Sequence, residues 1–317
     1  MRNICFLIIA IFICSRVGGK EKVEALPVEH ERALLATPTE TARVETGSTI
    51  RQPFDRIGSD GSYWGVRDLS DLIAFLDDTS IRSIRLVVGT FSDLSPLAAL
   101  TELEELEIFM SEPVGDISPI GSLGNLRRLR LFNSGTEESI EPLSSLINLR
   151  YLDLTYYDRY FKQLLPLHQL EVLRINNPSL EPIDVIYIAQ LHSLRNLEIG
   201  SRLFLPSLQQ LRNLVNLERL SISSSLDIDL SWITSLENLK RLEIIGSTIY
   251  DISPLAKLPN LEELDLYRTE VRDFTPLLES RSLTEISRAT VEDEYQLELH
   301  ALFRSRGITL VLYISDR

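Results

Sequence analysis

The side chains that most often carry catalysis are few and scattered in this sequence. The two cysteines, Cys5 and Cys14, lie at the very start of the chain. The four histidines never form a His-x-His or His-Glu-x-x-His pair, the spacings that bind zinc; they are His30, His168, His192 and His300. Glycine-rich phosphate loops and the G-x-S-x-G nucleophile motif are also absent. We therefore expect no enzyme, no cofactor and no metal site.

One group of side chains instead suits noncovalent binding. Phe109 and Phe132 lie 132 − 109 = 23 residues apart, and arginines flank the second of them. Exposed aromatic side chains beside arginines are typical of the energetically dominant centre of a protein interface. The predicted partner-binding residues are Val87, Phe109, Met110, Arg128, Arg130, Phe132, Tyr151 and Tyr156. The alternative is that Tyr156, Tyr157 and Phe161 fold over the two phenylalanines as internal packing.

An internal repeat must position these residues. Residues 239–260 read LKRLEIIGSTIYDISPLAKLPN and residues 261–282 read LEELDLYRTEVRDFTPLLESRS, a period of 261 − 239 = 22 residues. A period of 20 to 29 residues with an L-x-x-L-x-L pattern is typical of leucine-rich repeats. The repeats begin at Ile81, Leu103, Leu126, Leu149, Leu170, Leu194, Leu217, Leu239 and Leu261, and a degenerate tenth begins at Leu283.

Each repeat predicts a strand and then a short helical segment. The L-x-L alternation indicates a strand, and strands from successive repeats should stack in parallel. In the motif Asp-Ile-Ser-Pro at 251–254, we expect the serine hydroxyl to cap a helical turn whose first residue is proline. An asparagine before the next leucine, such as Asn260, favours a left-handed turn back into the strand. The short repeat 149–169 and the long repeat 170–193 predict longer outer helices or a bulge.

The motif DISPLAKLPNL at 251–261 resembles the short repeats of bacterial internalins and of the phosphatase-regulator class. The resemblance covers roughly 81–286. It implies an α/β leucine-rich repeat solenoid, a right-handed arc with a parallel concave sheet and short helical or 3₁₀ segments on its convex side. It also implies a non-catalytic scaffold whose concave face binds a protein.

The predicted division of the chain is a signal peptide at 1–19, a disordered linker at 20–62, an N-terminal helical cap at 63–80, nine repeats at 81–282, and a degenerate repeat with a C-terminal helix–strand cap at 283–317. The leader pattern consists of Arg2, an uncharged run from Ile4 to Cys14, and small residues up to Gly19. We expect a secreted or cell-envelope protein and a monomer. Alternatives are a lipoprotein anchored at Cys14, with a structural or enzyme-regulating role, and a carbohydrate-binding protein.

Charge restricts the partners further. The net charge of −14 becomes −16 once the leader takes Arg2 and Arg16 with it, and such a chain repels nucleic acid. The fifth residue of successive repeats alternates in sign, which predicts a ladder of ion pairs: Arg85, Glu107, Arg130, Asp153, Arg174 and Glu198. An acidic cluster near the end is either a solvated face or an attraction for a basic partner or cation: Glu262, Glu263, Asp265 and Glu285.

Overall fold

A computed structural model describes the part of the chain that contains the repeats. The described residues are 56–57, 63–64, 69–76, 81–89, 93–110, 115–136, 139–157, 161–177, 180–200, 208–271, 273–287 and 294–311. All of them belong to one compact unit, Pro53–Arg317. The predicted signal peptide and nearly all of the predicted linker lie outside the described residues, so the proposed division of the chain stays a prediction.

A single open sheet with its strands in sequence order runs through this unit. The short β1 (Arg56–Ile57) pairs antiparallel with β2 (Tyr63–Trp64), and every later neighbour is parallel. The later strands are β3 (Ser83–Gly89), β4 (Glu105–Met110), β5 (Arg128–Thr136), β6 (Tyr151–Tyr157), β7 (Val172–Asn176), β8 (Asn196–Gly200), β9 (Arg219–Ser223), β10 (Arg241–Ile245), β11 (Glu263–Tyr267), β12 (Glu285–Ser287) and β13 (Thr309–Val311). This open parallel sheet confirms the leucine-rich repeat solenoid.

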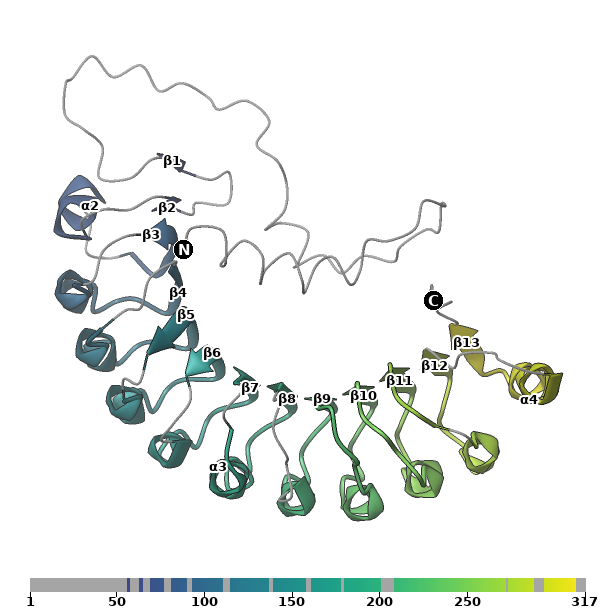
Figure 1. Cartoon of the computed structure of the whole chain (residues 1–317). Coiled ribbons are helices and arrows are strands. Elements are labelled where there is room, and N and C mark those ends of the chain that lie inside the picture. Colours follow the sequence, from purple (N-terminus) through teal and green to yellow (C-terminus); the bar gives the residue numbers. More distant parts are fainter. Residues whose placement is uncertain are drawn as a thin grey trace. The chain divides into compact units, whose positions relative to one another are not determined.

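Short helical segments return the chain from each strand to the next. Figure 1 shows them along the outer side of the curve, with the strands along its inner side. The 3₁₀ segments are η2 (Ser95–Ala99), η3 (Ser118–Ser122), η4 (Glu141–Ser145), η5 (Phe161–Leu164), η6 (Leu208–Asn213), η7 (Ser231–Ser235), η8 (Ser253–Lys257) and η9 (Thr275–Glu279). One return in the long repeat is an α-helix, α3 (Pro182–Ile188), as the length of that repeat predicts. Register shifts at Val87/Gly89 and Phe132/Thr136 mark the ends of β3 and β5.

One continuous apolar core lies between the sheet and these outer segments. The repeated leucines and isoleucines stack in register, for example Leu220, Leu242 and Leu264 on three successive strands. Most of these side chains are almost wholly buried. At the two ends of the described part, α2 (Leu69–Leu76) contributes Leu72 to the core, and α4 (Glu294–Ser305) contributes Phe303. Such terminal elements cover apolar surface that stacking leaves open at the ends of a solenoid.

Five of the described helical turns are capped by aspartate, so the serine cap expected in the Asp-Ile-Ser-Pro motif is wrong. The residue before η8 is Ile252, which has no capping side chain, and the segment starts at Ser253. The Oδ1 atom of Asp251 accepts a hydrogen bond from the Ser253 backbone N–H at 2.8 Å. The aspartates of four other repeats do the same: Asp93, Asp116, Asp229 and Asp273. A carboxylate two residues upstream reaches the N–H more easily than the serine's own hydroxyl does.

The asparagines before each leucine also act differently from the expectation. None of the described asparagines has a left-handed backbone. Each instead donates its side-chain Nδ2 to a backbone carbonyl of the preceding repeat, as Asn125 does to Thr101 at 3.0 Å and Asn148 to Gly124 at 2.9 Å. Asn216, Asn238 and Asn260 repeat this bond. The asparagines therefore join neighbouring coils on the outer side, while the strands join them on the inner side.

The aspartate caps predict loss of stability in acid. Hydrogen bonds from Ser95, Ser231 and Ser253 backbone N–H groups, and from the Ser118 hydroxyl, lower the pKa of the capping aspartates below the usual 3.8. A lowered pKa in the folded state stabilises the fold above pH 3.8, and that contribution disappears as the pH falls through the lowered values. In thermal unfolding followed by circular dichroism, Asp116→Asn/Asp251→Asn should melt below the wild type at pH 7. The difference in melting temperature between the variant and the wild type should become smaller toward pH 2.5. A difference that does not change with pH would contradict a role of the aspartate charges.

The backbone at Gly246 predicts a local intolerance of side chains. Its φ is 77°, and an added Cβ would lie 2.9 Å from the Ser224 carbonyl oxygen. Because a left-handed backbone penalises an L side chain, Gly246→Ala should lower the free energy of unfolding by about 1–2 kcal/mol. Gly124→Ala is the matched control, since nothing lies within 4 Å of its added Cβ. Equal denaturant midpoints for the two variants would refute the argument.

Candidate functional site

The concave face of the sheet presents three rows of outward side chains. Residues 3, 5 and 7 of each repeat alternate with the buried leucines and so point away from the core. The strand register aligns each row across neighbouring strands, as with Glu105–Arg128, Glu107–Arg130 and Phe109–Phe132. The chemistry of this face therefore changes from strand to strand along each row.

Ion pairs link the charged row on the first strands, as its alternating signs predict. Arg85 pairs with Glu107 at 2.6 Å, Arg130 with Asp153 at 3.1 Å, and Arg174 with Glu198 at 3.2 Å. Glu107 is the centre of the network, because Arg128 and Arg130 also lie 3.5 and 3.8 Å from its carboxylate. Only 7% of Glu107 is exposed, so this carboxylate depends on its three arginines for solvation.

The two phenylalanines form a stacked pair beside this network. The ring centroids of Phe109 and Phe132 are 6.1 Å apart, with 28° between the ring planes. Both side chains are half-buried, so one side of the pair faces solvent. The Arg130 guanidinium lies 5.2 Å from the Phe109 ring centroid, within reach of a cation–π interaction. Phe161, which was expected as a cover in the alternative interpretation, belongs to the buried core.

Tyr151 extends the aromatic surface by one strand. The Arg128 guanidinium lies 3.9 Å from its ring centroid, and that of Arg174 lies 5.9 Å away. Burial first, and then the nearby Asp153 carboxylate, raise the pKa of the Tyr151 phenol above 10.0. The phenol therefore stays protonated at neutral pH and keeps a hydrogen-bond donor on this surface.

The other three predicted binding residues are not shown to be exposed on this face. Val87 is in register with Phe109 on the neighbouring strand, yet only 4% of it is exposed, so the expectation that it lies open is wrong. Met110 and Tyr156 end up in β4 and β6, but their side chains lie outside the described residues. Their contact with a partner stays a prediction.

We call the set of Phe109, Phe132, Tyr151, Arg128 and Arg130 the aromatic patch.

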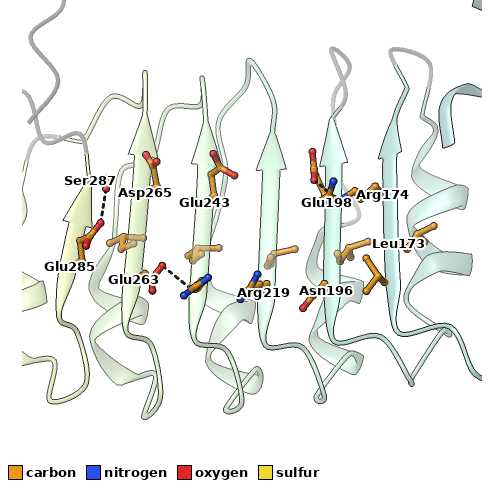
Figure 2. A pocket seen from close by; sticks show the side chains of 16 residues that line it. Leu173, Arg174, Asn196, Glu198, Arg219, Glu243, Glu263, Asp265, Glu285 and Ser287 are labelled. Atoms are coloured by element: carbon orange, nitrogen blue, oxygen red, sulfur yellow. Dashed lines mark hydrogen bonds and ion pairs between the residues drawn. The ribbon is translucent and has the colours of Figure 1, made fainter. Parts of the chain in front are cut away.

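A groove of about 370 Å³ crosses the second half of the same face, from β7 to β12. Figure 2 shows its charged side chains on neighbouring strands. Arg219 and Arg241 lie side by side at the third position of their repeats, where β9 and β10 begin, followed by Glu263 and Glu285 at the start of β11 and β12. A second row places Glu243 beside Asp265. Glu263, Asp265 and Glu285 of this groove belong to the acidic cluster expected from the sequence, whereas Arg219 and Glu243 were not expected in a site.

The described histidines do not form a site. His168 and His192 are exposed on turns, whereas His300 is mostly buried on α4. Burial, and then the charge of Arg304, lower the pKa of His300 below 6.5, which keeps the ring neutral at pH 7. Among the described residues, no three His, Cys, Asp or Glu side chains are grouped so as to hold a metal ion. No helix in that part of the chain has the length and hydropathy of a membrane span.

The fold is similar to that of a solved internalin structure. An internalin from Listeria monocytogenes aligns with a TM-score of 0.56 and 23% identity, covering 71% of this chain and 72% of the internalin. Internalin C2 from the same organism gives a TM-score of 0.39 at 25% identity, over 65% and 75% of the two chains. The plant peptide hormone receptor RGFR1, solved with RGF2, gives 0.45 at 15% identity, over 67% and 41%. No protein-family model and no curated protein sequence matches the chain.

The position of Glu107 predicts that it stabilises the concave face. Removing its carboxylate leaves three arginines without their common partner, so Glu107→Ala should lower the free energy of unfolding by about 1–3 kcal/mol. The control is Glu171→Ala, which removes an exposed ion pair with Arg150 of 2.7 Å and should cost about 0–1 kcal/mol. Urea unfolding of both variants measures the difference. A Glu107→Ala effect no larger than that of Glu171→Ala would show that the network contributes little.

Proposed function

We propose that this leucine-rich repeat solenoid is a non-catalytic scaffold that binds a protein partner through its concave sheet, chiefly at the aromatic patch on β4–β6. The observation that carries the proposal is the half-buried stack of Phe109 on Phe132 on the concave face. An aromatic pair that faces solvent, ringed by arginines, matches the composition of interface hot spots, which favour aromatic residues and Arg over other types.

The geometry supports binding because the patch is already ordered. The phenylalanines project from strands that are bonded on both sides, and Arg130 is held by Asp153 at 3.1 Å. Side chains that are fixed before binding lose little conformational entropy when a partner arrives. The ion pairs with Glu107 and Asp153 offset part of the charge of the arginines, so apolar and π surface makes up much of the patch. A partner would contact it with apolar or aromatic side chains of its own.

The test uses the full chain as bait, identifies captured proteins by mass spectrometry, and then measures the affinity of the purified partner. Phe132→Ala should weaken binding by about 30-fold, the equivalent of a 2 kcal/mol hot spot. Ile147→Ala/Val215→Ala is the control, because it truncates exposed apolar side chains on the outer turns. Unchanged affinity in a Phe132→Ala variant that still melts as the wild type does would overturn the proposal.

We also propose that the protein is exported to the cell envelope or secreted, with cleavage after Gly19. The support is the sequence pattern of Arg2, the uncharged run from Ile4 to Cys14, and the small residue at the cleavage point.

Expression with the intact leader in a secreting bacterial host, followed by mass spectrometry, should give a mature chain that begins at Lys20. Cys14→Ser should leave that product unchanged. A mature chain that begins at Cys14 with an added lipid would show anchoring, and an intact Met1 in the cytoplasm would refute export.

A further inference from the structure

The two halves of the concave face differ in how their charges are compensated. On β3–β6, every charged residue at the fifth position takes part in an ion pair with a neighbouring strand. On β10–β12, the described residues that line the groove include the carboxylates of Glu243, Glu263 and Glu285 and one cation, Arg241. Arg241 forms an ion pair with Glu263 at 2.7 Å, so its charge is already neutralised. The second half therefore keeps an excess of negative charge.

Three groove residues have no ion-pair partner among the described residues: Arg219, Glu243 and Glu285. Glu243 accepts only a hydrogen bond from the Ser221 hydroxyl, at 2.9 Å, and Glu285 accepts one from the Ser287 hydroxyl, at 3.4 Å. Arg219 is exposed and lies in register between Asn196 and Arg241, neither of which is acidic. A cation and two carboxylates are thus available within one groove.

The spacing of these charges defines a ligand that carries both signs. Arg219 lies on β9 and Glu285 on β12, three strand spacings away, or about 14 Å at about 4.8 Å per strand. An extended peptide covers that distance in about four residues, at about 3.3 Å each. The groove floor is the sheet backbone at positions such as Leu220, Leu242 and Leu264, whose side chains lie buried in the core on the other side of the sheet. Charges that meet above this floor therefore interact next to an apolar layer, which is a medium less polar than water.

We propose that this groove binds an extended basic segment of the partner protein, with Lys or Arg side chains over β10–β12 and an acidic residue against Arg219. The proposal rests on the proposed function and names the second contact region of the same partner. Charge complementarity selects this occupant, because the uncompensated carboxylates attract cationic side chains and repel acidic surfaces. It also orients the partner along the sheet, with its apolar part on β4–β6 and its basic part on β10–β12.

Synthetic peptides test the groove without knowledge of the partner. The probes are three labelled peptides with one uncharged backbone sequence that carries three lysines, three glutamates or no charge. Fluorescence anisotropy with the full chain should show binding of the lysine peptide only, and binding should weaken between about 20 and 150 mM salt because ions screen exposed charges.

Matched variants separate the groove from the general acidity of the chain. Glu243→Gln/Glu285→Gln should lower the affinity for the lysine peptide about tenfold. Glu237→Gln/Glu270→Gln makes the same change of net charge outside the groove and should lower this affinity less than twofold. Arg219→Glu should raise the affinity for the lysine peptide severalfold, a gain that loss of folding cannot produce. Equal losses in the two double variants, or no gain with Arg219→Glu, would overturn the proposal.

The purified partner distinguishes this proposal from the proposed function. Phe132→Ala should lower the affinity for the partner and leave the affinity for the lysine peptide unchanged. Glu243→Gln/Glu285→Gln should lower both affinities. A partner that depends on Phe132 but keeps its affinity for the Glu243→Gln/Glu285→Gln variant would refute the groove and leave the aromatic patch in place.

Discussion

Stacking of identical coils is the constraint on which this structure depends. A repeat of about 22 residues cannot enclose its own leucines, so each coil buries them only against the coils before and after it. That requirement fixes the strand register, as seen in the aligned Leu220, Leu242 and Leu264. The same register aligns the outward residues in rows. Burial on one side of the sheet thus determines which side chains become neighbours on the other.

The periodic part of the structure could be predicted from the sequence, because it follows from spacing alone. The leucine positions give the parallel sheet, and the alternating signs at Arg85, Glu107, Arg130 and Asp153 give ion pairs between strands. Both depend on residues that lie one repeat apart. The register then makes neighbours of residues that share a position in successive repeats.

Features that depend on the distance between particular atoms, or on the particular residues of the adjacent strands, could not be predicted from the sequence. The serine and the aspartate of the Asp-x-Ser motif both carry a capping oxygen, and only backbone geometry shows that Asp251 reaches the Ser253 N–H. Val87 shares the outward position of Phe109 and lies between the strands of Trp64 and Phe109, yet only 4% of it is exposed. Arg219 and Glu243 could not be singled out from the sequence. Each lacks an oppositely charged partner on the adjacent strands, and only the register of the strands reveals this.

The strictly sequential order of the described strands has a mechanical consequence, since none of these strands is bonded to any but its neighbours in the chain. A pull on the two ends of the solenoid would load the terminal coils first and peel them away singly, without shearing a closed core. Each released coil of 261 − 239 = 22 residues would supply about 70 Å of slack. Under tension such a molecule would behave as an extensible spring that lengthens in even steps, and its remaining coils would still hold their rows in line.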